Sequence, residues 1–270
     1  MRNLRWIFLG AFCATLGAST SSGLATTRIH VSIMGSTALV PLIKEVLPEW
    51  ESKHPLVRVS VTGGGSWAGL AAVSKGQADI GMSDIAPSHL VATRLIKYPL
   101  GRLPVLFIAH RANVPRWVSS HSLRELFTGR YKNWHQAGGP NLRVVIVSRP
   151  LSSGSRYVVE QRVLLGQSLT PHAIIQLSNG ALYKTVLSTP GALGYLEWRP
   201  GLKGVVVMAV GPNRFANNRP TNWPYYTEPT LYVPSQASAL VKQLAFWLSQ
   251  TPKREEFGIY PVDSMVQGHQ

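Results

Sequence analysis

The chain has 270 residues, which suits one large domain or two lobes of about 100–120 residues each. Hydrophobic residues make up 45% of it and charged residues only 14%, so the composition excludes a disordered polyelectrolyte and a coiled coil. The 27 basic residues outnumber the 12 acidic residues, and the resulting formal charge of +15 favours anionic partners. Because the basic residues are dispersed and no zinc-finger or RNA-binding motif accompanies them, we expect no nucleic-acid partner.

Residues 1–25 are typical of a cleavable secretory signal peptide. Arg2 and Arg5 precede an apolar run that is too short to span a bilayer, and small residues around Ala25 follow it. No lipoprotein cleavage motif precedes Cys13, the single cysteine of the chain. We therefore predict an exported protein, periplasmic or secreted, without a lipid anchor and without a disulfide after cleavage.

From residue 29 onward, strand and helix patterns alternate along the chain. The patterns predict strands at residues 29–33, 57–61, 78–81, 103–109, 144–147, 192–196 and 205–210. They predict helices at residues 38–53, 66–75, 89–96, 123–127, 153–165, 179–187 and 237–248, with Ser122 and Ser235 as two of the caps. The Pro- and Asn-rich segment 212–229 is expected to form an irregular loop. This alternation indicates an α/β architecture, in which ligands bind where the carboxyl ends of strands turn into helices.

Three of these strand-to-helix turns share one chemistry: Gly35-Ser36-Thr37, Gly63-Gly64-Gly65-Ser66 and Ser153-Gly154-Ser155. Their small residues let backbone N–H groups approach a ligand, and their hydroxyls donate hydrogen bonds. The start of a helix also carries free N–H donors and roughly half a positive charge. One such turn is compatible with an ordinary helix cap, whereas three of them indicate an oxyanion site that needs no metal.

Two charged residues narrow the choice of anion. Arg149 follows a predicted strand, and its guanidinium can bind an oxyanion through two parallel hydrogen bonds. Asp84 follows another strand and would repel a fully ionised anion, although it is also compatible with an ordinary turn residue. Phosphate keeps a proton at ordinary pH and can donate it to a carboxylate, whereas sulfate has none. Asp84 therefore predicts discrimination against sulfate.

Six segments, in this order, resemble the phosphate-binding subunit of Pst-type phosphate ABC transporters. Within residues 29–198 they read GSTALVPLIKEVLPEW, VTGGGSWAGL, QADIGMSDIAP, LRELFTGRYKNWHQAGGP, VVIVSRPLSSGSR and STPGALGY. The resemblance implies a type II periplasmic-binding-protein fold, in which two α/β lobes are joined by two crossover strands. We expect residues 26–104 and 200–270 to form the first lobe and residues 105–199 the second. It further implies a monomer without catalytic activity, cofactor or metal, which captures inorganic phosphate for permease subunits in the inner membrane.

The resemblance also assigns the phosphate contacts. They fall on Thr37, the backbone N–H of Ala38, Ser66, Asp84, Arg149, Ser153, Gly154 and Ser155. Ser155 stands where the family usually has threonine, and the hydroxyl is retained. Leu151 stands where the family often has an acidic residue that pairs with the arginine, so we expect Arg149 to be held less firmly here.

Other functions stay open at this point. A different tetrahedral oxyanion, or a role as a phosphate sensor or scavenger, fits the same turns. Gly63, Gly65 and Ala68 also match a dinucleotide-binding fingerprint, with Asp84 at a suitable distance, but the predicted export disfavours an enzyme that uses a nicotinamide cofactor. The sequence has no complete nucleophile elbow, zinc-protease spacing or Walker lysine, so we expect no enzymatic activity.

Overall fold

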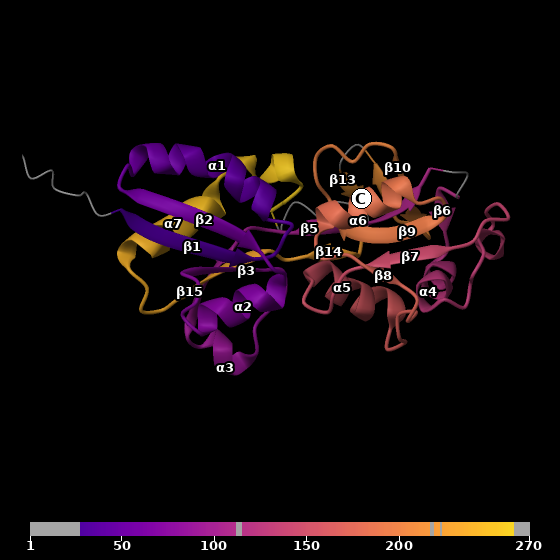
Figure 1. Cartoon of the computed structure of the whole chain (residues 1–270), viewed down its shortest axis with the longest axis horizontal. Coiled ribbons are helices and arrows are strands. Elements are labelled where there is room, and N and C mark those ends of the chain that lie inside the picture. Colours follow the sequence, from indigo (N-terminus) through magenta and orange to yellow (C-terminus); the bar gives the residue numbers. More distant parts are fainter. Residues whose placement is uncertain (1–27, 112–114, 217–218, 222, 262–270) are drawn as a thin grey trace, which may run out of the picture.

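The computed structural model describes residues 28–111, 115–216, 219–221 and 223–261. It consists of two α/β lobes that lie side by side along the long axis of the molecule (Figure 1). The predicted signal peptide, residues 1–25, lies outside the described residues. Within the described ranges, no helix combines the length and the apolar character that a membrane crossing requires.

The first lobe contains a five-stranded sheet with the strand order β2-β1-β3-β15-β4. Its strands are β1 (Ile29–Gly35), β2 (Val57–Gly63), β3 (Ile80–Ser83), β4 (Leu95–Pro99) and β15 (Thr230–Pro234). Strands β2, β1 and β3 are parallel, whereas β15 runs antiparallel to both of its neighbours. Helices α1 (Val40–Lys53) and α7 (Ala239–Gln250) cover one face, and α2 (Ser66–Ser74) and α3 (His89–Ala92) lie on the other (Figure 1).

The core of the first lobe follows from the apolar periodicity of the sequence. Val31 and Ile33 alternate with more exposed residues along β1 and point into the layer under α1 and α7. In α1, apolar residues recur every three or four positions, so that one side of the helix is buried. Trp50 on that side packs against Trp247 of α7, with ring centroids 5.4 Å apart.

The second lobe is built on a six-stranded sheet with the order β10-β5-β9-β7-β8, and β14 also pairs with β5. Its strands are β5 (Leu103–His110), β7 (Val145–Ser148), β8 (Ile174–Ile175), β9 (Ala192–Glu197), β10 (Val205–Val207) and β14 (Tyr226–Thr227). Its helical segments are α4 (Ser120–Thr128), η1 (Trp134–Ala137), α5 (Gly154–Val159), the π-helical η2 (Glu160–Leu164) and α6 (Asn179–Ser188). Two small sheets pair β6 (Trp117–Val118) with β11 (Ala209–Val210) and β12 (Arg214–Ala216) with β13 (Arg219–Thr221). The remaining helical segment, η3 (Pro252–Phe257), lies beside α1 of the first lobe.

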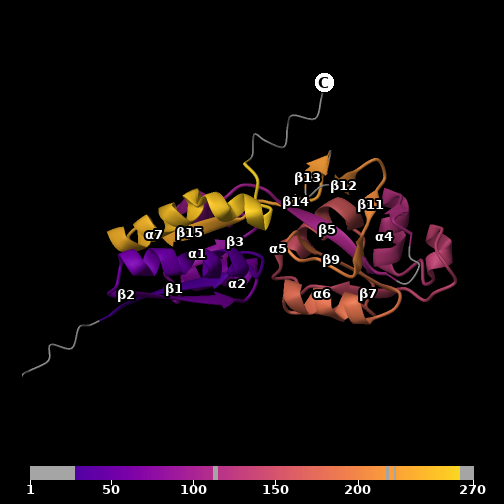
Figure 2. The same cartoon turned by 90° about the horizontal axis from the view of Figure 1, so that it is seen from above.

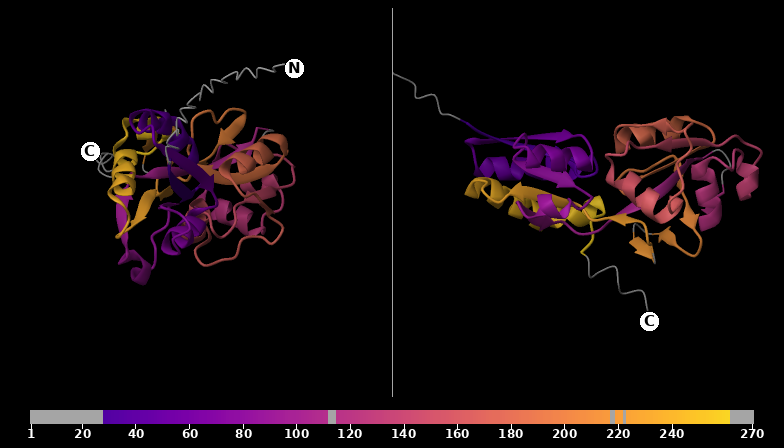
Figure 3. Two further views of the ribbon diagram at one scale, coloured as in Figure 1. Left: turned by 60° about the vertical axis from the view of Figure 1, so that its left-hand side comes forward. Right: turned by 90° about the horizontal axis from the view of Figure 1, so that it is seen from below.

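The chain passes between the lobes twice, at residues 100–102 between β4 and β5 and at residues 228–229 between β14 and β15 (Figures 2 and 3). The second crossing corrects the lobe boundary expected at residues 199 and 200. Strands β10 and β14 both pair with β5, so these two strands belong with the second sheet. Buried apolar side chains between them, such as Met208 and Tyr225, join the second core, a long-range association that local patterns do not report.

Two predicted segments also differ from the structure. The helix expected at residues 89–96 ends at Ala92, because residues 95–99 form β4 and pair with β15. The irregular loop expected at residues 212–229 contains the short strands β12, β13 and β14. In both places strand pairing with a distant segment overrides the local propensity.

Two helix caps lie three residues from the predicted serines. Ser119, not Ser122, caps α4, and its Oγ accepts a hydrogen bond from the Ser122 backbone N–H at 2.9 Å. Ser238, not Ser235, caps α7. Both segments contain several serines, and the turn geometry selects which of them reaches the free N–H groups.

Candidate functional site

The carboxyl ends of the three parallel strands of the first lobe meet at one edge of its sheet. Gly35, the last residue of β1, pairs in register with Gly63 of β2 and with Met82 of β3. The backbone N–H groups of Gly64 and Gly65 both donate to the carbonyl oxygen of Gly35, at 2.8 and 2.9 Å. The turns that follow β1, β2 and β3 therefore begin side by side.

The second lobe has an equivalent edge. Strand β7 runs parallel to both β8 and β9, and Ser148 pairs with Ile175. Arg149 follows β7 directly, and Glu197 is the last residue of β9. A guanidinium and a carboxylate therefore lie at the carboxyl edge of this sheet.

The two edges meet around a narrow cavity that is partly open, and its empty space of about 140 Å³ includes open solvent. Residues of both lobes line it: Ser36, Thr37, Gly65, Ser66 and Asp84 of the first, and Arg149, Ser153, Gly154 and Glu197 of the second. Six of the eight residues predicted as ligands are in this wall: Thr37, Ser66, Asp84, Arg149, Ser153 and Gly154. The structure thus brings the three predicted turns together around one space.

The other two predicted residues lie next to the wall. The backbone N–H of Ala38 donates to the Oγ atom of Ser36 at 3.2 Å. Ser155 is fully buried, and its Oγ lies 3.0 Å from the Oγ atom of Ser153. Each of these two residues therefore supports a hydroxyl of the wall.

Three residues of the wall, Ser36, Gly65 and Glu197, were not predicted as ligands. Ser36 and Gly65 belong to the turns that the sequence singled out. Glu197 directly follows the predicted strand 192–196, and the signal that identified Asp84, a carboxylate at a strand end, could have found it.

The lobes touch each other across the cavity. A Cβ atom at Gly154 would lie 2.4 Å from the Cβ atom of Asp84, so only glycine fits there. The backbone N–H of Trp67 donates to the carbonyl oxygen of Ser152 at 3.2 Å. Gly65 has a φ of +91°, a conformation that glycine adopts without strain, and it packs against Ser152. Backbone at both turns therefore sets how closely the lobes approach.

Arg149 is 2% exposed and held by four acceptors, although Leu151 stands where the family often has an acidic residue. Its Nε donates to the carbonyl oxygen of Gln176 at 3.0 Å, and Nη1 donates to the Oδ1 atom of Asn179. Its Nη2 donates to the carbonyl oxygen of Leu177 and to the Oγ1 atom of Thr37, both at 3.2 Å.

The expectation that Arg149 is loosely held is therefore wrong. Leu151 is 70% exposed and does not pair with the guanidinium. Two backbone carbonyls and the side chain of Asn179 accept its hydrogen bonds instead. Burial lowers the pKa of Arg149, and the charges of Glu197, Tyr195 and Asp84 oppose that effect. The guanidinium stays positively charged, as arginine does in proteins.

Asp84 is 8% exposed and is oriented by two serines. Its Oδ2 atom accepts hydrogen bonds from the Oγ atoms of Ser36 at 2.5 Å and Ser66 at 3.0 Å. Its Oδ1 atom is buried and has no hydrogen-bond partner among the described residues. Burial, and next the charge of Glu197, raise the pKa of Asp84 to about 7, against the opposing effects of the two serine hydrogen bonds and Arg149. Asp84, which lines the cavity, therefore has one buried oxygen that lacks a donor among the described residues.

Glu197 is 2% exposed and is linked to Arg149 through one side chain. The Nδ2 atom of Asn179 donates to the Oε2 atom of Glu197 at 2.7 Å, while the Oδ1 atom of Asn179 accepts from Arg149. No cluster of three metal-ligating side chains occurs in the part of the chain that the structure describes. The wall is thus one cation, two carboxylates and several hydroxyls.

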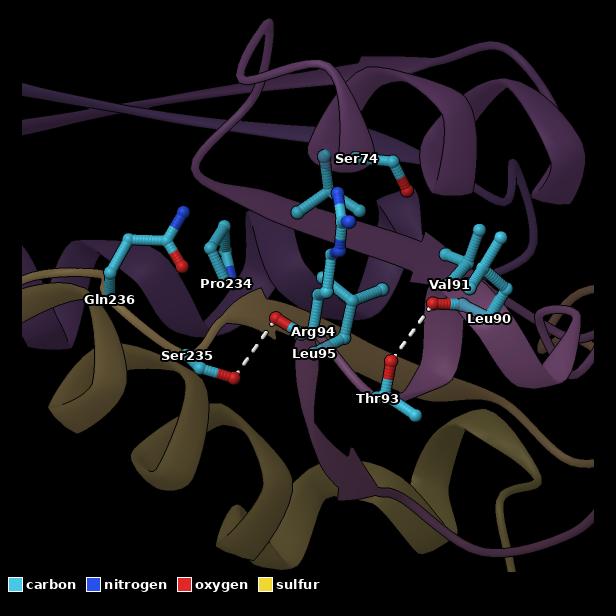
Figure 4. A pocket seen from close by; sticks show the side chains of 10 residues that line it. Ser74, Leu90, Val91, Thr93, Arg94, Leu95, Pro234, Ser235 and Gln236 are labelled. Carbon is cyan, nitrogen blue, oxygen red and sulfur yellow. Dashed lines mark hydrogen bonds between the residues drawn. The ribbon is translucent and has the colours of Figure 1, made fainter.

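A second hollow lies on the first lobe, away from these residues (Figure 4). Val73 of α2, Leu90 of α3, Arg94 and Leu95 contribute to it. Ser235 closes one side, and its Oγ donates to the carbonyl oxygen of Arg94 at 3.0 Å. None of the predicted ligand residues lines this hollow.

Comparisons with known proteins agree with this architecture. A family model described as a PBP superfamily domain matches residues 20–253. The phosphate-binding protein PstS of Bacillus subtilis (strain 168) is 26% identical over 276 residues, which cover 96% of this chain and 92% of that protein.

Two crystal structures share the fold. One is a putative phosphate ABC transporter substrate-binding protein with bound phosphate from Clostridium perfringens, with a TM-score of 0.75, 20% identity, and coverage of 84% of this chain and 96% of that one. The other is an ABC-type phosphate transport receptor from Vibrio cholerae, with a TM-score of 0.66, 22% identity and the same coverage. The match to the family model over most of the sequence, together with the two-lobed fold, shows that this chain belongs to the PBP, or periplasmic-binding-protein, superfamily.

Proposed function

We propose that this protein captures inorganic phosphate outside the cytoplasm and delivers it to the permease of an ABC transporter. The observation that carries the proposal is that Asp84 and Arg149 line one cavity, and that the buried Oδ1 atom of Asp84 has no donor among the described residues. A buried polar group without a partner costs about 1–3 kcal/mol, so a ligand that supplies a donor is favoured. Phosphate supplies an acidic hydrogen to Asp84 and anionic oxygens to Arg149, whereas sulfate supplies only the oxygens.

The hydroxyls of the wall support an anionic ligand. The Oγ1 atom of Thr37 accepts from Arg149, which leaves the hydroxyl hydrogen of Thr37 free to be donated to the ligand. Ser153, on the other lobe, also lines the cavity. Since donors come from both lobes, binding an anion between them stabilises the arrangement in which the lobes touch.

The division of the site between the lobes suggests how the protein works in transport. We propose that a monomer binds phosphate without chemical change and that the permease of an inner membrane receives the closed form. The relatives named above are described as a binding protein, a transport receptor and a substrate-binding protein, which favours binding over catalysis. We further propose that residues 1–25 direct export and are removed.

Isothermal titration calorimetry of the purified, phosphate-free protein tests the ligand. We expect tight binding of phosphate and at least about hundredfold weaker binding of sulfate, because sulfate leaves Asp84 facing an anionic oxygen. Arsenate, which carries the same acidic hydrogens, should compete with phosphate. Equal affinities for phosphate and sulfate, or the absence of phosphate binding, would refute the proposal.

A second experiment tests the transport role. Uptake of radiolabelled phosphate should fall when the gene is deleted from its host and return when the gene is restored. Unchanged uptake in the deletion strain would favour a phosphate sensor or scavenger instead.

A further inference from the structure

The two lobes differ in their balance of charge. Residues 103–227, the part of the chain between the two crossings, contain 14 basic residues and only three acidic residues. Residues 28–102 and 228–261, on the side of the first lobe, contain 11 basic and 8 acidic residues. A uniform adaptation of the whole chain would reduce the acidic residues of both lobes alike, so the excess of positive charge on the second lobe needs a local explanation.

The three acidic residues of the second lobe do little to neutralise its surface. Glu125 and Glu197 are buried, and Glu160 is one-third exposed and pairs with an arginine at 2.8 Å. On the first lobe, by contrast, the side chains of Glu45 and Glu49 are more than half exposed, and each pairs with a lysine. The exposed basic residues of the second lobe therefore lack the acidic neighbours that the first lobe provides.

Several of these basic residues gather at the end of the second lobe that is farthest from the first. The segment between α4 and β7 forms this end of the molecule (Figures 1 and 2). It contains the exposed residues Arg130, Lys132 and Arg143. The backbone N–H of Val144 donates to the carbonyl oxygen of Lys132 at 2.9 Å, and Asn133 and Arg143 form a β-bridge, so Lys132 and Arg143 lie on neighbouring stretches of chain.

Arg116, which precedes β6, joins this group. A Cβ atom at Gly139 of the same segment would lie 2.9 Å from the side chain of Pro115, so the chain next to Arg116 packs against the segment. Arg116 is exposed, and so is Trp117 at 52%. We name this surface the basic end; it consists of Arg116, Trp117, Arg130, Lys132 and Arg143.

Most of the charge of the basic end is unpaired. Arg130 pairs with the buried Glu125 at 3.3 Å, whereas Arg116, Lys132 and Arg143 form no ion pair with any described residue. An exposed tryptophan beside unpaired cations is typical of protein surfaces that lie at the boundary between water and lipid headgroups. The basic end therefore combines the two features of a surface that binds to a membrane.

We propose that the basic end binds the anionic headgroups of a phospholipid membrane. Charge complementarity selects an anionic surface, and Trp117 favours lipid over nucleic acid because an indole ring enters the headgroup layer. The choice of partner rests on the proposed function, which brings the protein to a permease in a membrane. Since the basic end lies at the far end of the molecule from the first lobe, membrane binding leaves the cavity between the lobes free.

Flotation of the purified, exported protein with lipid vesicles tests the proposal. We expect binding to vesicles of equimolar phosphatidylglycerol and phosphatidylcholine, and no binding to vesicles of phosphatidylcholine alone. Binding to the anionic vesicles should fall steeply between about 0.05 and about 0.5 M salt, because salt screens the attraction.

A triple variant locates the binding surface. Replacing the three unpaired cations of the basic end by glutamine should weaken binding to anionic vesicles about hundredfold, at about fivefold for each cation. The substitutions are Arg116→Gln, Lys132→Gln and Arg143→Gln. None of these residues lines the cavity, so the affinity for phosphate should not change.

A matched control removes the same charge from the first lobe. It replaces three exposed lysines, in the substitutions Lys44→Gln, Lys75→Gln and Lys97→Gln. Its binding to anionic vesicles should stay within about threefold of wild type, because charges farther from the membrane than the screening length contribute little.

Each outcome decides the question. Absence of binding to anionic vesicles at about 0.05 M salt would overturn the proposal. Equal losses in the two triple variants would overturn it as well, because total charge and not the basic end would then attract the membrane. Tighter binding to duplex DNA than to anionic vesicles would exclude a lipid surface. Phosphate affinity is measured separately by calorimetry, so a failure of the proposed function is distinguishable from a failure of membrane binding.

Discussion

Replacing Asp84 with asparagine should stabilise the ligand-free protein while it damages the site. The side chains have nearly the same shape, and the Oδ1 atom of asparagine can accept the hydrogen bonds that Ser36 and Ser66 now donate. The substitution removes a buried negative charge, one oxygen of which has no donor among the described residues. It also removes the repulsion between this charge and Glu197, which lines the same cavity. We expect a gain in stability because the folded protein holds this charge at a cost.

The pKa of Asp84 gives the magnitude and the pH range. It rises from 3.8 to about 7 on folding, so the folded state holds the proton more tightly than the unfolded state. The ionised group therefore costs stability increasingly as the pH rises from about 4 to about 7 and by a constant amount above that. At about 1.36 kcal/mol for each pKa unit, the cost above pH 7 is on the order of 4 kcal/mol.

Thermal and urea unfolding of the phosphate-free protein measure this effect. Near pH 8, Asp84→Asn should raise the midpoint of thermal unfolding by about 10 °C, and the difference should disappear below about pH 4. Asp79→Asn is a suitable control, because Asp79 accepts hydrogen bonds from the backbone N–H and the Oγ of Ser32, at 2.7 and 2.8 Å, and should gain no stability on substitution. Equal stability of Asp84→Asn and wild type near pH 8 would refute the reasoning.

Three further substitutions probe the site and its frame. Arg149→Ala should weaken phosphate and sulfate alike by about hundredfold or more in calorimetry, because both anions lose the same charge-assisted hydrogen bonds; selective loss of one anion would contradict this role. Gly154→Ala should weaken phosphate binding roughly ten- to hundredfold, since the new methyl group collides with Asp84. Gly180→Ala in α6 is the control: its nearest neighbour is 3.8 Å away, so the affinity for phosphate should not change. Ser153→Ala should lower the free energy of unfolding by about 1 kcal/mol in urea titration through loss of the α5 cap, and an unchanged value would exclude that capping role.

The chemistry of the site was largely predictable from local sequence. Glycine- and serine-rich turns after strands predicted three openings, and the parallel register of β1, β2 and β3 places two of them and Asp84 at one edge. Arg149 was predicted because it follows a strand and precedes the third turn. These inferences hold because a strand, a turn and the start of a helix are set by residues close together in the chain.

The partners of Arg149 required the tertiary structure. Because position 151 is leucine and not an acidic residue, the sequence predicts that the guanidinium of Arg149 is held less firmly. The carbonyl oxygens of Gln176 and Leu177 and the side chain of Asn179 nevertheless hold it by hydrogen bonds. These acceptors follow Arg149 by about thirty positions in the chain, and local patterns carry no information about which distant segment will lie against a side chain.

The amino-acid sequence by itself determined the α/β class, the turns with their donors, and the charged groups Asp84 and Arg149. The tertiary structure decided that strands β10 and β14 join the second sheet, that Glu197 lines the cavity, and that Gly154 meets Asp84 across the lobes. The division has a physical reason. Secondary structure and turn chemistry depend on neighbours along the chain, whereas strand pairing and burial depend on contacts between distant segments, which form only when the whole chain folds.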